Sequence, residues 1–219
     1  MMETRQPGSG GPPAALLILG ITVAAYFFQM ANFVEAMRLF ALWPLATPEQ
    51  MRFADVGTLQ TGFQPWQLIS YGFLHGGLGH LFFNMFALYM FGLPIERAWG
   101  TRRFVIFYFV CMVGAGLVQL TVAAVSGEVY PTIGASGAVF GLLLAFGMMY
   151  PNNTIMLLIP PIPMKAKYFV VGYGILTLIF GMTGVMPGIA HFAHLGGMLF
   201  GLLLILYWGR QDYHRRRRG

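Results

Sequence analysis

The run FVIFYFVCMVGAGLVQLTVAAV, residues 104–125, contains no Asp, Glu, Lys, Arg or His side chain. A helix that crosses the hydrocarbon core of a bilayer needs about 20 mostly apolar residues, so this run is long enough to span a membrane. Its apolar residues surround the whole helix, unlike those of an amphipathic surface helix. They are also continuous, unlike the alternating segments of a transmembrane barrel. The run therefore predicts a membrane-spanning helix.

Five further runs of the same character occur, as the composition leads one to expect. The 219 residues are 57% hydrophobic and 9% charged, and the mean hydropathy is +0.67, whereas soluble domains carry about 25% charged residues. Too little polar surface remains to coat a soluble globule, which argues against a soluble enzyme, a disordered regulator and a nucleic-acid reader. The six predicted spans are 14–31, 78–95, 104–125, 133–150, 168–186 and 189–208.

These spans predict a membrane domain with a short tail at each end. We expect residues 1–13 to form a cytoplasmic N-terminal tail, residues 14–208 the six-helix membrane domain, and residues 209–219 a basic cytoplasmic tail. The connection over about 32–64 is long, and long connections are often functional. Its apolar side chains predict that it lies partly in the outer membrane interface. Pro160, Pro161 and Pro163 prevent the loop before the fifth span from remaining helical.

The basic residues predict an all-α membrane protein with both termini in the cytoplasm (N-in, C-in). In this orientation eleven of the 13 Lys and Arg residues face the cytoplasm, and only Arg38 and Arg52 face outward, as the positive-inside rule requires. The arginine run 215–218 is then a topology anchor on anionic lipid rather than a nucleic-acid site. The minimal layout and the lack of a transit peptide predict the plasma (inner) membrane of a prokaryote.

Several chemistries are disfavoured by what the spans contain. The single cysteine, Cys111, lies in an apolar run and excludes both an intrachain disulfide and a multi-cysteine metal site. No Asp or Glu lies inside a predicted span, which argues against a proton pump and against a complete Ser-His-Asp triad. No internal repeat is present, which weakens a transporter built from inverted halves. We therefore expect neither a metal nor a cofactor.

Polar side chains within or beside the spans are few, and the topology places several of them at one depth. They are His75, His80, Asn84, Gln119, Ser136, His191 and His194. His80 and Asn84 are spaced i, i+4 and share a helix face, Ser136 lies in the first turn of the fourth span, and His194 lies about 7.5 Å below the start of the sixth. A serine, a histidine and two hydrogen-bond donors at one level can supply the nucleophile, the base and the oxyanion donors of acyl transfer.

Glycines accompany both the serine and the histidine. Ser136 stands in the sequence Gly134-Ala135-Ser136-Gly137 directly before a helix, whose first N–H groups are free to face a developing negative charge. Two small-xxx-small pairs allow close helix packing in lipid, namely Gly137 with Gly141 and Gly197 with Gly201. Packing alone would account for these glycines. Combined with a serine and a histidine at the same helix ends, they predict that Ser136 meets His194.

The sequence resembles the rhomboid intramembrane serine proteases in three segments that occur in family order. They read HGGLGHLFFNM over residues 75–85, GASG over residues 134–137 and AHLGG over residues 193–197. The resemblance covers about 65–208 and implies a six-transmembrane-helix rhomboid-like bundle.

The resemblance also implies a role for each residue in these segments. Ser136 would be the nucleophile and His194 its general base, while His80 and Asn84 would donate to the oxyanion together with the Ser136 backbone N–H. His75 would be mainly structural, holding the outer loop to the second helix. Further structural positions near the site are Gly134, Gly137, Phe140 and Gly197. His191, one turn from His194, is the nearest rival for the base, and Glu96 with Arg97 is interpreted as a structural pair at the inner end of the second span.

Two positions depart from the family pattern. Many members carry Trp-Arg in the outer loop, where this chain has Trp66-Gln67, which puts the anchoring of that loop in question. Many also carry Tyr four residues after the nucleophile, stacked on the base. Here Phe140 keeps the ring and loses only the hydroxyl, so we expect the stack to survive.

The function that the resemblance implies is that of a serine endopeptidase that cleaves transmembrane segments near their outer ends. Its partners would be transmembrane protein substrates and the lipid bilayer, and it would bind no nucleic acid. The substrates would enter the site sideways, past the fifth helix. One alternative is a catalytically inactive rhomboid-like protein that binds membrane clients, against which the presence of both Ser136 and His194 argues. A second alternative, a small-solute channel or transporter, would require polar groups through the full depth of the bilayer.

Overall fold

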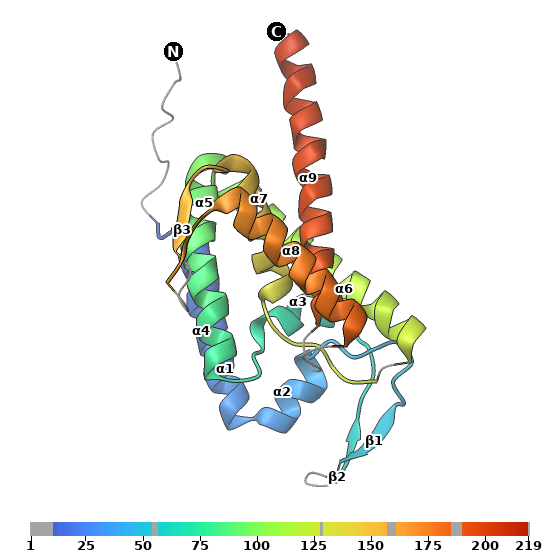
Figure 1. Ribbon diagram of the computed structural model, residues 1–219. Coiled ribbons are helices and arrows are strands. Elements are labelled where there is room, and N and C mark those ends of the chain that lie inside the picture. Colours follow the sequence, from blue (N-terminus) through green and yellow to red (C-terminus); the bar gives the residue numbers. More distant parts are fainter. Residues whose placement is uncertain (1–10, 54–56, 128, 157–160, 185–189, 219) are drawn as a thin grey trace.

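The computed structural model describes residues 11–53, 57–127, 129–156, 161–184 and 190–218, and helices make up most of this structure (Figure 1). Five helical stretches in the described part of the chain are long and apolar enough to cross a membrane. They are α1 (Ala14–Ala31), the continuous stretch Leu78–Trp99, α6 (Thr101–Ser126), α8 (Ala166–Thr183) and α9 (His191–Arg218). A further apolar helix, α7 (Ser136–Met149), is shorter, with 14 residues.

The remaining elements are short. The stretch Leu78–Trp99 consists of α4 (Leu78–Ala87), a π-helical turn (Leu88–Gly92) and α5 (Leu93–Trp99). The connecting elements are α2 (Phe33–Phe40), the hairpin of β1 (Gln50–Phe53) and β2 (Gly57–Gln60), α3 (Gln67–Ser70), the 3-10 turn Tyr71–Phe73, and the hairpin of β3 (Thr154–Met156) and β4 (Pro163–Lys165).

The fourth span begins later than the sequence predicts. The predicted window starts at residue 133, but α7 starts at Ser136. Gly134 has a φ of +122°, which does not fit a helix, and it donates its N–H to the carbonyl of Tyr71 at 2.9 Å. The 14 residues of α7 extend about 21 Å, less than the roughly 30 Å of a hydrocarbon core. The glycine turn therefore shortens this helix at the end that carries Ser136.

The last span continues past the predicted start of the basic tail. α9 runs unbroken to Arg218 and projects beyond the other helices in Figure 1. Arg103 of α6 donates to both carboxylate oxygens of Asp212 at 2.9 and 3.1 Å, and its guanidinium lies over the ring of Trp208 at 5.4 Å. These contacts hold the extension of α9 against α6, so residue 209 is not a boundary of secondary structure.

The long connection over about 32–64 contains a helix and a hairpin. The strands β1 and β2 are antiparallel, with Gln50 opposite Gln60. Farther back in the chain, Leu42 exchanges two backbone hydrogen bonds with Thr132, which lies just before α7. Leu42 is buried, whereas Leu45 is 62% exposed. The connection is therefore attached directly to the segment that leads into α7.

Gln67 is completely buried and holds the same connection through its side chain. Its side-chain carbonyl accepts from the backbone N–H groups of Trp43 and Gln64 at 3.3 and 3.1 Å, and its amide donates to the carbonyl of Gly62 at 3.4 Å. Trp66 donates its indole N–H to the carbonyl of Leu39 at 2.8 Å. An uncharged side chain thus ties this connection to α3.

Glu96 is not paired with Arg97, contrary to the sequence interpretation. The Glu96 carboxylate is buried and accepts from the backbone N–H groups of Ala14 and Ala15 at 2.8 and 2.9 Å, and from the Thr101 hydroxyl at 2.8 Å. Arg97 is exposed. The first N–H groups of a helix lack partners within the helix, and a carboxylate satisfies them well. Glu96 therefore caps α1.

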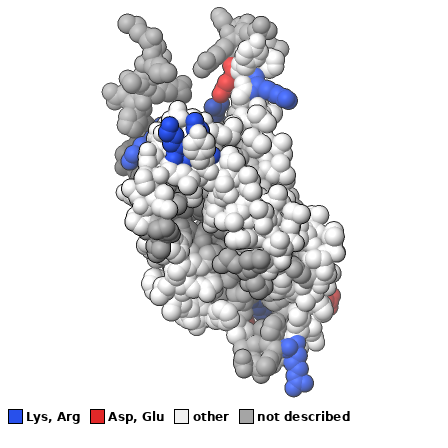
Figure 2. All heavy atoms as spheres, in the orientation of Figure 1, with Lys and Arg blue, Asp and Glu red and all other residues white. Residues whose placement is uncertain are grey.

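The buried core is centred on α6 and α7. α6 contributes large side chains that are fully buried, including Phe104, Phe107, Tyr108 and Met112. α8 contributes little to this core, since its three buried residues are Ala166, Val170 and Thr177. On the face drawn in Figure 2, charged side chains lie at the two ends of the molecule with an uncharged band between them. This distribution suits a chain surrounded by lipid at its middle.

Candidate active site

Ser136 and His194 are in direct contact. Ser136 is the first residue of α7, and His194 lies in the first turn of α9. The His194 Nε2 and the Ser136 Oγ are 2.7 Å apart, which is hydrogen-bonding distance. The structure therefore brings together the two residues that the sequence paired.

Glycines permit this contact between α7 and α9. A Cβ atom at Gly197 would collide with the backbone carbonyl of Gly137, and a Cβ atom at Gly141 would collide with Cys111 of α6. Gly201 is also tightly enclosed, since its Cβ would lie 3.0 Å from the ring of Phe107 and 3.1 Å from the sulfur of Cys111. Small residues of this kind let helix backbones approach closely in lipid. The three helices thus meet at the level of the serine.

His80 lies beside the turn that leads into Ser136. A Cβ atom at Gly134 would be 2.8 and 2.9 Å from the Cε1 and Nε2 atoms of the His80 ring. The backbone N–H of Gly76 donates to Nδ1 of His80 at 3.2 Å. Because Nδ1 accepts, the neutral ring carries its proton on Nε2. The donor edge of His80 is therefore the edge that lies next to the Gly134–Ser136 turn.

Asn84 follows one turn later on α4 and faces the same cavity. It is 6% exposed, and its Nδ2 donates to the His80 carbonyl at 2.9 Å. An amide nitrogen carries two protons, so this bond uses one of the two. Asn84 thus keeps a second donor for a group bound in the cavity.

His75 ties α4 to α1 through its backbone. Its N–H donates to the Gln29 side-chain carbonyl at 2.9 Å, and the Gln29 amide donates to the His75 carbonyl at 3.0 Å. The His75 ring is buried and meets the His80 ring edge-on, with centroids 5.0 Å apart. Burial, and secondarily the nearby His80, lowers the pKa of His75 to about 4, so this ring is neutral at physiological pH.

Phe140 stacks on His194, as expected from its retained ring. The centroids are 4.2 Å apart and the ring planes differ by 12°. Phe140 in turn stacks on Tyr173 of α8, with centroids 4.9 Å apart and planes 24° from parallel. Sequence analysis missed Tyr173, because nothing in the apolar α8 sequence indicates which of its residues faces the site.

His191, the rival base, does not contact the serine in this structure. Its ring centroid is 6.3 Å from that of His194, at a steep interplanar angle of 84°. The residue is 8% exposed, and its Nε2 is buried without a hydrogen-bond partner among the described residues. The geometry therefore favours His194 over His191 as the partner of Ser136.

A cavity of about 1080 Å³ contains this group. Its polar side chains include Ser136, His194, His80, Asn84 and His191, and most of the other lining residues are apolar or aromatic. Among the described residues, no Asp or Glu lines it, and no group of three His, Cys, Asp or Glu could hold a metal ion. The contact between Ser136 and His194 thus lies in a cavity whose described lining residues include no carboxylate.

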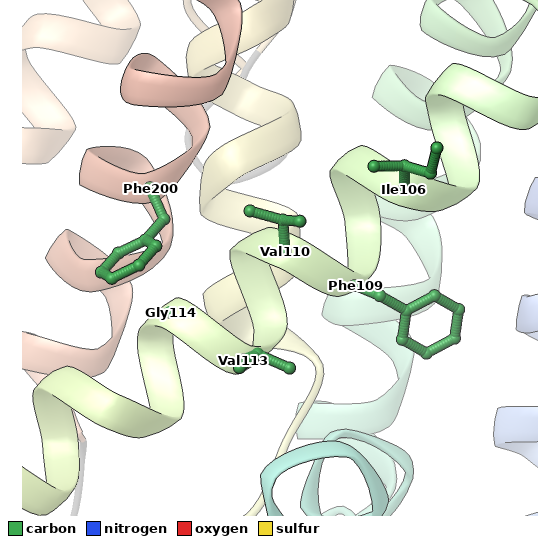
Figure 3. Close-up of a pocket in the computed structure, with 6 residues that line it drawn as sticks. All are labelled: Ile106, Phe109, Val110, Val113, Gly114 and Phe200. Atoms are coloured by element: carbon green, nitrogen blue, oxygen red, sulfur yellow. The ribbon is translucent and has the colours of Figure 1, made fainter. Parts of the chain in front are cut away.

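A smaller cavity of about 360 Å³ lies between α6 and α9 (Figure 3). Its lining is apolar throughout, with Ile106, Phe109, Val110, Val113, Gly114 and Phe200. No side chain there can act as a nucleophile, a base or a hydrogen-bond donor. Of these two cavities, only the larger one therefore offers groups for catalysis.

This chain is similar to known proteins over most of its length. A family model described as the Rhomboid domain matches residues 62–211. RHOMBOID-like protein 4 of Arabidopsis thaliana is 34% identical over 74% of this chain and 40% of its own length. Rhomboid protein 1, mitochondrial, of Saccharomyces cerevisiae is 25% identical over 98% of this chain and 69% of its own length. Rhomboid protease GluP of Bacillus subtilis is 32% identical over 62% of this chain and 24% of its own length. The chain thus spans about two fifths of the length of the Arabidopsis relative and a quarter of that of the Bacillus relative.

Proposed function

Because this chain belongs to the rhomboid family, we propose that it is an intramembrane serine endopeptidase. It is a multi-pass membrane protein, and its substrates would be transmembrane segments of other membrane proteins. The observation that carries the proposal is the 2.7 Å contact between Ser136 and His194 inside a cavity at the start of α7. A relative named as a protease, from Bacillus subtilis, supports the same activity.

The proposed reaction begins with attack of the Ser136 oxygen on the carbonyl carbon of the scissile peptide bond. His194 takes the serine proton on Nε2 as the new bond forms. The same proton then passes to the leaving amine nitrogen as the peptide bond breaks, which leaves an acyl ester on Ser136. Water, deprotonated by His194, hydrolyses the ester and restores the serine hydroxyl.

The negative oxygen that develops during attack needs donors aimed at it. We assign this role to the Nε2–H of His80, the second amide proton of Asn84 and the Ser136 backbone N–H at the helix start. All three groups lie on the wall of one cavity. The apolar remainder of the wall excludes bulk water and strengthens each of these interactions.

We further propose that α7 is a sixth crossing and that both termini are cytoplasmic. The first residues of α1 are bonded to Glu96 at the end of α5, and α9 ends on the same side in Figure 1, which suits an even number of crossings. The split of basic residues, eleven against two, supports the cytoplasmic assignment of that end. Location in a prokaryotic plasma membrane stays a prediction, since the relatives include plant, mitochondrial and bacterial proteins.

Two other functions compete with this proposal. A client-binding protein without activity would belong to the same family, but it would not need Ser136 and His194 at 2.7 Å from each other. A channel or transporter would need polar groups through the depth of the bilayer, whereas the wall of the cavity is mostly apolar.

A fluorophosphonate probe, which reacts with activated serines, separates enzyme from client-binding protein. We expect the purified protein to be labelled and to cleave a single-span reporter in proteoliposomes. Ser136→Ala should lose both activities, and Ser126→Ala, which changes an exposed serine at the end of α6, should keep both. A folded wild-type protein that is neither labelled nor active would support the client-binding alternative.

A further inference from the structure

Four aromatic rings form a continuous stacked series that leads from the base to α8. His194 stacks on Phe140, Phe140 stacks on Tyr173, and the ring of Phe169 follows Tyr173 with centroids 5.5 Å apart and planes 14° from parallel. His194 belongs to α9, Phe140 to α7, and the other two to α8. The series therefore joins three helices through ring faces.

The orientation of the base depends on such contacts because no carboxylate lines the part of the site that the structure describes. In a Ser-His-Asp triad the acid bonds the second ring nitrogen and fixes the imidazole in place. Among the described residues that line this cavity there is no Asp or Glu. The near-parallel ring of Phe140 is the contact that fixes the plane of the His194 ring. The hydrogen bond to Ser136 fixes only the position of the Nε2 edge of that ring.

Phe140 is itself stacked on Tyr173, which belongs to a helix with few buried residues. Most of α8 is exposed, and apart from Ala166 at its start its buried residues are Val170 and Thr177. Tyr173 lies between these two in the sequence and lines the cavity. A movement of α8 therefore changes the support of Phe140 and, through it, the plane of the imidazole.

We propose that Tyr173 is a positioning residue for the base, so that the orientation of His194 depends on where α8 lies. This inference rests on the proposed function. Tyr173 acts through Phe140 and does not touch the reacting atoms. The base is correctly oriented when α8 packs on α7, and displacement of α8 lowers the reactivity of Ser136 even when the cavity is more accessible.

The experiment measures the rate at which a small fluorophosphonate labels Ser136 in the full-length protein. Labelling needs an oriented base but no sideways entry of a transmembrane helix. Tyr173→Leu should slow labelling about three- to tenfold, the range expected for loss of one aromatic pair. Tyr173→Phe keeps the ring and should stay within about twofold of wild type. The matched control is Tyr168→Leu on the same helix, a change of a 62% exposed side chain outside the cavity, which should have no effect.

Two further measurements separate positioning from general loosening. With the single-span reporter, Tyr173→Leu should lower kcat and leave KM nearly unchanged. In a Phe140→Leu background the same change should slow labelling much less than it does in wild type, because the path through Phe140 is already broken. If Tyr173→Leu does not fold, Tyr173→Met also removes the ring, and its unbranched, flexible side chain can adapt to the space that the ring leaves. The same slower labelling is expected of this variant.

Failure of the positioning role of Tyr173 and failure of the proposed function give different results in these experiments. Absence of labelling in the folded wild type would overturn the proposed function. A labelled wild type together with unchanged labelling of folded Tyr173→Leu, or full additivity with Phe140→Leu, would overturn the positioning role. Faster reporter cleavage with unchanged labelling would show that Tyr173 only restricts entry to the cavity.

Discussion

Gly197 of α9 lies against the backbone carbonyl of Gly137 of α7, with no room for a Cβ atom. His194 is one helical turn before Gly197, and Ser136 directly precedes Gly137. The 2.7 Å contact of the dyad therefore depends on how closely these two backbones approach. A side chain at Gly197 would separate the two helices and, with them, the base from the nucleophile.

We predict that Gly197→Ala destabilises the protein by about 1–3 kcal/mol, the usual cost of overpacking, and abolishes most activity. The matched control is Gly209→Ala in the same helix, where nothing lies within 4 Å of the added methyl group. Thermal unfolding and fluorophosphonate labelling of both variants test the prediction. Wild-type labelling by Gly197→Ala would mean that the helices adjust without separating the dyad.

The oxyanion assignment predicts that Asn84→Ala stays folded and lowers turnover roughly 10²-fold, the scale for one lost donor. His80→Ala should lose a similar amount, since its Nε2–H is the second side-chain donor. Reporter turnover, measured alongside thermal unfolding, is the readout. If both single variants are fully active, the two residues serve helix packing only.

The two histidines of α9 should behave differently when replaced. His194→Ala should lose several orders of magnitude in turnover, because Ser136 then has no base. His191→Ala should keep most activity and at most shift substrate preference, because its ring lies away from the serine, at the wall of the cavity. An active His194→Ala beside a folded but inactive His191→Ala would reverse the assignment of the base.

Gln67→Ala should lower the free energy of unfolding by about 1–3 kcal/mol, because it leaves the backbone N–H groups of Trp43 and Gln64 without their acceptor. Gln60→Ala, at an exposed position of β2, is the matched control and should be neutral. The shift in the thermal unfolding midpoint checks this. Equal midpoints for the two variants would show that the loop does not depend on Gln67.

The topology can be tested by cysteine accessibility in a Cys111→Ala background. Leu45 is exposed in the outer connection, and Gln211 is exposed near the end of α9. An impermeant reagent added to intact cells should label Leu45→Cys and should not label Gln211→Cys until the membrane is opened. Labelling of Gln211→Cys from outside would place the cavity on the cytoplasmic side.

The sequence alone was sufficient to predict the five long apolar helices of the described residues, because the length and continuity of an apolar run determine whether a helix can cross a bilayer. It also predicted that Ser136 and His194 meet, because each occurs in a short segment with its own glycines, and those segments occur in a recognisable order. The stacking of Phe140 on His194 was predictable as well. Phe140 is four residues after Ser136 and therefore lies on the same face of α7 as the serine.

Other features required the tertiary structure, because they join residues that are distant in the chain and have no local signal. Glu96 caps α1 across more than 80 residues, although its neighbour Arg97 made a local pair the simpler interpretation. The late start of α7 follows from the backbone conformation of Gly134 and from its bond to Tyr71, neither of which hydropathy reports. Tyr173 is one aromatic residue among several on an apolar helix, and only the packing of α8 against α7 selects it as the ring that faces Phe140.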